Sequence, residues 1–316
     1  MRWNIVGAFI RNNPFGTEIA FRKGLERIGE TVNVVDPSYP RQFFDMDADV
    51  NLVFKYLDPN ADFGNGIKYR DTLRQLGGHK IVYQVDDLRF PHIKQMMQEM
   101  LSVCDHALTF DEDGARLARE YGYKNAQRLL LTADNQLYRR IPELPKDIDV
   151  SFIGSLSHGP SHASRMRMCR RIQEFADWQN KLHQDAPQWH RRFNFVVANE
   201  LFDIPKICAI YNRSKIVLNH ATDVGQPFGH GYGYQCRHFE AGFSGACVLS
   251  NFVDNDDTIK NFYTYDNEET MMSILIDLVH HPEDCQRVGD ALYAELNANH
   301  TPEHRARELC EFVRSL

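Results

Sequence analysis

The stretch Tyr234–Asn251, which reads YQCRHFEAGFSGACVLSN, contains the alternation of elements that decides the fold. Its first part, Tyr234–Phe243, is predicted to form a helix, and Ala246–Ser250 is a short apolar run typical of a buried strand. A helix that leads directly into a strand is the repeating unit of sheets whose parallel strands are connected by helices. This stretch therefore predicts an α/β fold.

The same alternation extends in both directions along the chain. Short β-rich runs predict further strands at Asn4–Phe9, Thr31–Asp36, Val50–Phe54, Lys80–Gln84, His106–Phe110, Arg128–Leu131, Val150–Gly154, Asn194–Ala198 and Lys215–Asn219. Apolar spacing predicts helices at Thr17–Ile28, Ile67–Leu76, Ile93–Val103, Glu112–Tyr121, Ser164–Leu182 and Ile204–Asn212. The tail is also predicted to be helical, because Thr301 is a good N-cap residue and Pro302 suits the first helical turn.

The segment Arg140–Lys146, RIPELPK, interrupts this pattern. Two prolines in a polar stretch indicate an interdomain linker, and the alternation restarts after it. We therefore expect two doubly wound domains, residues 1–145 and 146–300, and a C-terminal helix at 301–316 as a candidate to cross back to the first domain. Ligands of such sheets bind beyond the carboxyl ends of the strands, so the two halves are expected to face one cleft.

Composition narrows the class of protein. The 316 residues are 43% hydrophobic and 25% charged, as in an ordinary globular protein. The net charge of −7 argues against a general nucleic-acid binder, although residues 151–220 carry ten Lys and Arg against five Asp and Glu. Seven scattered cysteines without a C-x-x-C pair indicate neither a disulfide framework nor a zinc site. The N-terminal apolar run is too short for a signal peptide, and no stretch has the length of a membrane span, so a soluble cytoplasmic protein is expected.

Four stretches of the second half resemble the GT-B glycosyltransferases, and most of all the spore-maturation-protein-like branch of glycosyl transferase group 1. They are DVSFIGSLSHGPSHASRMRMCRRI from Asp149, YNRSKIVLNHA from Tyr211, the stretch Tyr234–Asn251, and Asp266–Leu278 with the tail NHTPEHRARELCEFV. The resemblance implies two Rossmann-like domains facing a cleft. It also implies transfer of a hexose or pentose from a UDP-, GDP- or dTDP-sugar to a hydroxyl acceptor, with retention, no bound cofactor and no metal.

The expected donor site centres on the helix that contains Arg237 and Glu240. These residues are three apart and share a helix face. A carboxylate accepts hydrogen bonds from two neighbouring ribose hydroxyls, and a guanidinium holds phosphate oxygens in a fork. Glu240 matches the second glutamate of the family's E-x7-E motif, which the resemblance implies to bind the donor ribose. The sequence departs from the motif at the first glutamate, where Tyr232 stands.

Several residues around this helix complete the expected donor site. The loop GQPFGHGYGY before it has glycines that let backbone amides approach a ligand, and it leads into a helix N-terminus that favours phosphate. Arg165, early in another helix, is implied by the resemblance to contact the donor diphosphate and to stabilise the leaving group, with Arg167 as the competing candidate. The remaining expected donor-binding residues are Gly154, Ser155, Asn219, Gly233, Tyr234 and His238.

The first domain is expected to supply the acceptor side of the cleft. Phe15, Gly16 and Thr17 follow the first strand, and the amides of Gly16 and Thr17 suit either the donor phosphate or the acceptor. Asp86 and Asp87 follow another strand. One of them is a candidate to hold or deprotonate an acceptor hydroxyl, although an Asp pair at this place more often caps the next segment.

The acceptor stays open at this point: a glycan, a small molecule or DNA. A DNA-modifying transferase that acts on hydroxymethylated bases of viral DNA is one alternative, favoured by the basic segment and by the compact chain. The missing first glutamate keeps a nucleotide-sugar epimerase or a catalytically inactive nucleotide-sugar-binding module as an alternative of another class.

Overall fold

The computed structural model describes residues 1–7, 16–36, 44–54, 69–156, 162–199, 203–222, 231–252 and 256–316. The chain forms two compact units. Unit 1 consists of residues Met1–Asp134 and His300–Leu316, and unit 2 consists of Asn135–Asn299. The boundary therefore lies between Asp134 and Asn135, ahead of the proline-containing segment that was expected to separate the domains.

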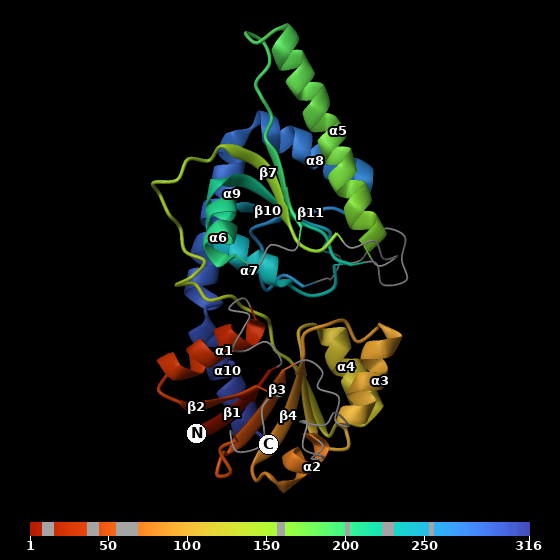
Figure 1. The fold of residues 1–316 in the computed structure, drawn as a ribbon, viewed down its shortest axis with the longest axis vertical. Coiled ribbons are helices and arrows are strands. Elements are labelled where there is room, and N and C mark those ends of the chain that lie inside the picture. The colour runs from red at the N-terminus through yellow and green to blue at the C-terminus, as the bar shows by residue number, and fades with distance from the viewer. Residues whose placement is uncertain are drawn as a thin grey trace. The chain divides into compact units, whose positions relative to one another are not determined.

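Unit 1 contains a six-stranded parallel sheet in the order β2-β1-β3-β4-β5-β6 (Figure 1). Its strands are β1 (Arg2–Val6), β2 (Thr31–Val35), β3 (Val50–Phe54), β4 (His79–Gln84), β5 (His106–Thr109) and β6 (Asn125–Arg128). Its helices are α1 (Thr17–Arg27), α2 (Tyr69–Gln75), α3 (Pro91–Met100), α4 (Glu112–Tyr121) and α10 (Pro302–Arg314).

Both faces of this sheet are covered, because alternate strand residues point to opposite sides. On one face Val6, Val53 and Val82 pack against apolar residues of α2, α3 and α4. On the other face Phe21 of α1 meets the ring of Tyr83, with ring centroids 5.3 Å apart. The C-terminal helix α10 packs against α1, so the last segment of the chain belongs to unit 1.

Unit 2 contains a five-stranded parallel sheet in the order β11-β10-β9-β7-β8. Its strands are β7 (Ile148–Ile153), β8 (Phe195–Ala198), β9 (Ser214–Asn219), β10 (Cys247–Ser250) and β11 (Tyr263–Thr264). Its helices are α5 (Ala163–Asp185), α6 (Ile204–Arg213), α7 (Cys236–Phe243), α8 (Glu268–His280) and α9 (Pro282–Asn299).

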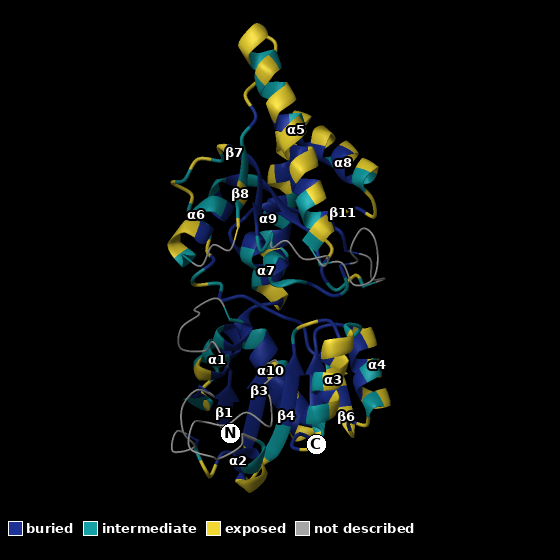
Figure 2. Ribbon diagram, turned by 45° about the vertical axis from the view of Figure 1, so that its right-hand side comes forward, coloured by how far each residue is buried: buried dark blue, intermediate teal, exposed yellow. Residues whose placement is uncertain are grey.

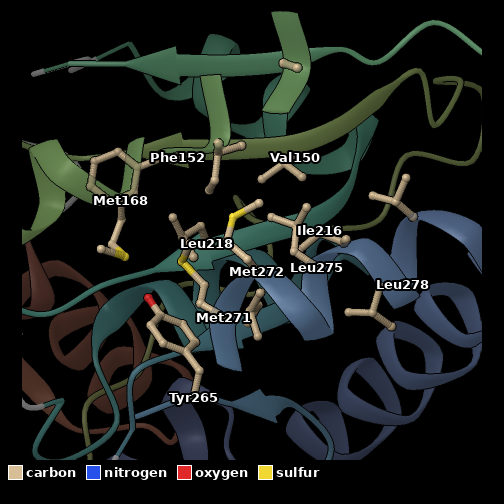
Figure 3. Packing of buried hydrophobic residues seen from close by; sticks show 14 of the residues in the cluster. Val150, Phe152, Met168, Ile216, Leu218, Tyr265, Met271, Met272, Leu275 and Leu278 are labelled. Carbon is tan, nitrogen blue, oxygen red and sulfur yellow. The ribbon is translucent and has the colours of Figure 1, made fainter. Parts of the chain in front are cut away.

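The core of unit 2 lies between the sheet and the helices α5 and α8 (Figure 3). Alternate residues of β7 and β9, such as Phe152 and Leu218, meet Met168 of α5 and Met271 and Leu275 of α8. In both units the central strands are mostly buried, whereas the helices expose their outer faces (Figure 2). This burial on two faces explains why the strands appear in the sequence as short continuous apolar runs.

The structure confirms the predicted α/β fold with two parallel sheets, and it corrects a few elements. The apolar run at residues 129–131 was expected to end a strand, but β6 is the preceding stretch Asn125–Arg128. Leu129, Leu130 and Leu131 are nevertheless buried. The apolar run therefore indicates a buried segment that is not a strand. The two-residue strand β11 is too short for any pattern to predict.

Candidate active site

The order of strands in unit 2 has a switch point between β7 and β9. The chain leaves β7 for β8 on one side, and it leaves β9 for β10 on the other side. Such a switch point separates the loops that follow the two strands, and ligands of doubly wound sheets bind there. The carboxyl ends that flank it are Ile153 and Asn219.

Arg237 joins these two strand ends. Its Nε donates a hydrogen bond to the carbonyl oxygen of Ile153, and its Nη1 donates to Oδ1 of Asn219 at 2.9 Å. The guanidinium also lies over the ring of Phe152, 5.3 Å from its centroid. Gly154 leaves room for it, because a Cβ at this position would lie 2.2 Å from Nη2. The guanidinium is therefore held at the switch point by the ends of two strands.

Arg165 of α5 also reaches the ends of these two strands. Its Nε donates to the carbonyl oxygen of His220 at 2.7 Å, and its Nη1 makes a long contact of 3.4 Å with the carbonyl oxygen of Ser155. Arg167 is exposed and pairs with Glu268 of α8, with 3.6 Å between Nε and Oε2. Of the two competing arginines, the structure thus places Arg165 at the strand ends and Arg167 on the solvent face of α5.

Buried polar side chains hold the end of β9 in place. Asn219 donates from Nδ2 to Oγ of Ser250 at 2.9 Å. The ring nitrogens of His220 contact the hydroxyls of Tyr265 at 2.7 Å and Ser164 at 2.9 Å. Because these residues are almost completely buried, they hold Asn219, which Arg237 contacts, and His220, whose carbonyl oxygen Arg165 contacts.

Glu240 lies on α7, one helical turn after Arg237. Its Oε2 accepts a hydrogen bond of 3.0 Å from the hydroxyl of Tyr211 on α6. Burial raises the pKa of the Glu240 carboxyl above its usual value, whereas the charge of Arg237 and the Tyr211 hydrogen bond act to lower it. In the described part of the chain no ion pair joins Arg237 and Glu240, so each has its own polar partners.

Part of the glycine-rich loop lies outside the described residues, Gly225 and Gly229 included. Gly233 has a φ of +62°, a conformation that favours glycine. The amide of Gly231 donates to the carbonyl oxygen of Asn251 at 2.9 Å. A Cβ at Gly231 would lie 2.6 Å from that oxygen, so this glycine serves a close approach of two backbone segments.

Tyr234 and His238 were expected to contact the donor, but their side chains are packed in the interior of unit 2. The Tyr234 hydroxyl donates to the carbonyl oxygen of Asp256 at 2.8 Å. The His238 ring lies edge-on to the rings of Tyr234 and Phe262, with centroids 5.7 and 4.9 Å away. Burial lowers the pKa of His238 to about 4, so the imidazole is neutral at pH 7. Because both side chains are buried, only the backbone at these two positions could contact the donor.

In unit 1 the order of strands places a second switch point between β1 and β3. Gly16 is the N-cap of α1, and Thr17 is its buried first residue, whereas Phe15 lies outside the described residues. The buried carboxyl group of Glu18 lies against both Gly7 and Gly16. The Glu18 carboxyl group is therefore a polar neighbour of the backbone at both glycines.

Asp86 and Asp87 lie in different surroundings. Asp87 accepts from the backbone amide of Arg89 at 2.8 Å and from its Nη1 at 2.9 Å. Arg89 also pairs with Asp111, the N-cap of α4, at 3.0 Å. Asp87 therefore belongs to a structural network, whereas Asp86 is exposed and has no side-chain hydrogen bond among the described residues.

Two residues of these sites were not singled out from the sequence. Tyr211 was quoted only as part of a longer stretch, and its contact with Glu240 depends on how α6 packs against α7. For Glu18 the sequence signal was weak, because acidic residues are common in the first turn of any helix and do not by themselves indicate a site.

Among the described residues, no group of three His, Cys, Asp or Glu side chains could hold a metal ion. None of the described helices is long and apolar enough to cross a membrane.

Comparison with known proteins finds a family match over the second part of the chain. Residues 157–311 match the model of a family described as glycosyl transferase-like. The matched segment begins just after β7 and contains Arg165, Tyr211, Arg237 and Glu240. No curated protein matches the chain in sequence.

Solved structures match over the whole length. An alpha-glucosyltransferase in complex with UDP and a 13-mer DNA containing an HMU base is 12% identical with a TM-score of 0.70, and the match covers 99% of each chain. A structure described as trehalose-6-phosphate from E. coli bound with UDP-2-fluoro glucose is 10% identical with a TM-score of 0.63, over 100% of this chain and 99% of the other. S. aureus TarM in a UDP complex is 11% identical with a TM-score of 0.52, over 94% and 58%. Residues 157–311 thus match a glycosyl transferase-like domain, and the chain as a whole has the GT-B fold of these solved structures.

Proposed function

We propose that the chain transfers a sugar from a UDP-sugar to a hydroxyl acceptor, without a bound metal and with retention of configuration. The observation that carries this proposal is the pair of guanidinium groups, Arg165 and Arg237, at the switch point of unit 2. Transfer breaks the bond between the sugar C1 and the phosphate oxygen, so negative charge develops on the leaving diphosphate. Two cations fixed in advance at that place stabilise the charge where it appears.

The neighbouring residues take the other roles. Gly154 allows phosphate oxygens to approach the backbone and the Arg237 guanidinium closely, with Ser155 and Asn219 at the rim. Glu240 accepts hydrogen bonds from the ribose hydroxyls. Gly233 and the backbone at Tyr234 and His238 border the same region through the start of α7.

On the acceptor side we assign the contact with the acceptor hydroxyl to Asp86. It is exposed at the carboxyl end of β4 and has no side-chain partner among the described residues. Asp87 keeps the turn in shape through Arg89. Gly16 and Thr17 border the acceptor through their backbone.

Calorimetry with UDP and UDP-glucose tests the donor assignment. The wild-type protein is expected to bind both, and Arg237→Gln is expected to weaken binding by about tenfold or more, because a charged partner of phosphate is lost. Arg171→Gln is the matched control, since Arg171 lies on the exposed face of α5 and pairs with Glu174 and Glu268. Equal affinity of wild type and Arg237→Gln for UDP would remove the guanidinium from the donor site.

A second candidate is a DNA acceptor. Two observations favour it: the full-length match to an alpha-glucosyltransferase bound to DNA, and the excess of Lys and Arg in residues 151–220. Binding to duplex DNA should then weaken steeply as salt rises, because phosphate contacts release counterions. A glycan or small-molecule acceptor is indicated if DNA binding is absent at 50 mM salt while UDP still binds.

We place the protein in the cytoplasm. All seven cysteines are free thiols, and six of them are buried, as expected for a reducing compartment. Thiol labelling after denaturation of protein taken directly from cells should find all seven reduced.

A further inference from the structure

Tyr211, the hydrogen-bond partner of Glu240, bears on the specificity for the donor. Tyr211 is only 1% exposed, and its hydroxyl donates to Oε2 of Glu240 at 3.0 Å. In the described part of the chain no other group donates a hydrogen bond to this carboxylate. One of the two carboxylate oxygens is thus fixed by the protein, and Oε1 keeps its lone pairs for a ligand.

The Tyr211 hydrogen bond opposes the effect of burial on Glu240. Desolvation favours the neutral carboxylic acid, which accepts fewer hydrogen bonds than the carboxylate. A hydroxyl that donates to the carboxylate favours the charged form. The other charged or titratable groups that face Glu240 are Arg237 on the same helix, Cys208 on α6 and Tyr138 on the segment before β7.

Tyr138 is a second buried tyrosine near Glu240 and can be compared with Tyr211. It is 3% exposed, and its ring centroid is 6.4 Å from that of Tyr211. The charge of Glu240 contributes to raising the pKa of Tyr138, so the two groups are near each other. The Tyr138 hydroxyl nevertheless has no hydrogen-bond partner among the described residues. Two buried tyrosines thus stand beside one carboxylate, and only one of them holds it.

We propose that Tyr211 is a positioning residue that orients Glu240 toward the ribose diol, and that this pair restricts the donor to ribonucleoside diphosphate sugars. The proposal rests on the proposed function, in which Glu240 binds the ribose. It disfavours dTDP-sugars, because a 2′-deoxyribose offers only one of the two neighbouring hydroxyls.

The experiment compares UDP with 2′-deoxy-UDP by calorimetry on the full chain. The wild-type protein should bind UDP about tenfold more tightly than 2′-deoxy-UDP, as one hydrogen bond to a charged acceptor is lost. Tyr211→Phe should weaken UDP binding by up to about tenfold and leave 2′-deoxy-UDP binding within about twofold. Tyr138→Phe is the matched control and should leave both affinities unchanged.

The outcomes separate the inference from the proposed function. An equal loss for both nucleotides in Tyr211→Phe, or no loss for UDP, would overturn the positioning role while UDP binding by the wild type still supports the transferase. A wild-type protein that binds no UDP would overturn the proposed function and this inference together. If Tyr211→Phe does not fold, Tyr211→Met fills a similar volume without the hydroxyl and must show the same selective loss.

Discussion

At the scale of single residues, Arg165 and Arg167 show how a small shift along a helix changes the role of a charge. They lie two positions apart on α5, which turns their side chains about 200° apart around the helix axis. One reaches the carbonyl oxygen of His220, and the other reaches Glu268. Only the first lies where a leaving diphosphate is proposed.

We therefore expect Arg165→Ala to lower kcat on the order of 10²-fold, while the dissociation constant of the donor rises by less than about tenfold. The reason is that negative charge on the diphosphate grows in the transition state. Loss of the guanidinium therefore destabilises the transition state more than the bound donor. Steady-state kinetics and calorimetry measure the two effects. Arg167→Ala is the control and should change neither; a larger effect in Arg167→Ala would show that the other face of α5 binds the donor.

The pKa of Glu240 predicts a pH dependence of donor binding. Burial raises this pKa above that of an ordinary glutamate, and only the ionised carboxylate accepts both ribose hydrogen bonds. UDP affinity should thus be full at high pH and fall as pH drops through the raised pKa, at a higher pH than a solvated glutamate would give. Glu240→Gln should remove this acidic limb. A limb of unchanged position in Glu240→Gln would assign it to another group.

The sequence predicted one part of the site and not another, for a physical reason. Arg237 and Glu240 belong to one helix, so their spacing alone places them on one face. The bond between Tyr211 and Glu240 joins residues 29 positions apart, and it exists only because α6 packs against α7. The assignment of Asp87 to a structural network likewise required Arg89 and Asp111, which come from different loops.

At the scale of elements, the end of β7 has to leave space for a side chain from α7. Gly154 does so: an added Cβ would come within 2.2 Å of Nη2 of Arg237. Its φ is not among the positive ones, so the backbone itself tolerates alanine. The glycine is therefore needed for the position of the guanidinium and not for the turn.

Gly154→Ala should accordingly weaken UDP binding by about tenfold, because the guanidinium must leave the strand ends. The melting temperature should change little, since the displaced side chain is long and partly exposed. Calorimetry and a thermal melt measure the two. Gly77→Ala, at a position where a Cβ would meet nothing within 4 Å, is the control. A large fall in melting temperature with normal UDP affinity would make Gly154 a purely structural glycine.

The elements themselves were predicted well wherever their pattern was local. The predicted bounds of the helix Glu112–Tyr121 agree with α4, which has Asp111 as a hydrogen-bonded N-cap and Gly122 in the left-handed region. The prediction for β6 was wrong because three leucines are buried without being in a strand. A run of hydrophobic residues indicates that a segment is buried. Whether the segment is a strand or a helix can be predicted only where the flanking residues also favour that element.

At the scale of the whole molecule, the chain passes from unit 1 to unit 2 and returns. Helix α10 packs on α1, where Gly24 lies so close to Pro302 that a Cβ would be 2.2 Å from its carbonyl oxygen. From the sequence, α10 was only a candidate to return to the first domain. Periodicity shows that a helix is amphipathic, but it does not show which element the helix packs against. The assignment of the tail to unit 1 needed the three-dimensional contacts.

The distribution of charge in unit 2 leads to a prediction about metal dependence. A donor diphosphate needs positive charge beside it, and two guanidiniums supply it at the switch point through bonds to strand ends. The described residues contain no group of three ligands for a cation. Turnover should therefore stay within about twofold after treatment with EDTA, because the charge that a metal would supply is already part of the protein. Steady-state kinetics before and after chelation measure this, and Arg165→Ala measured in the same way tells whether added Mg²⁺ or Mn²⁺ can replace a lost guanidinium. Activity that EDTA abolishes and Mn²⁺ restores in the wild type would mean that the arginines alone do not neutralise the leaving diphosphate.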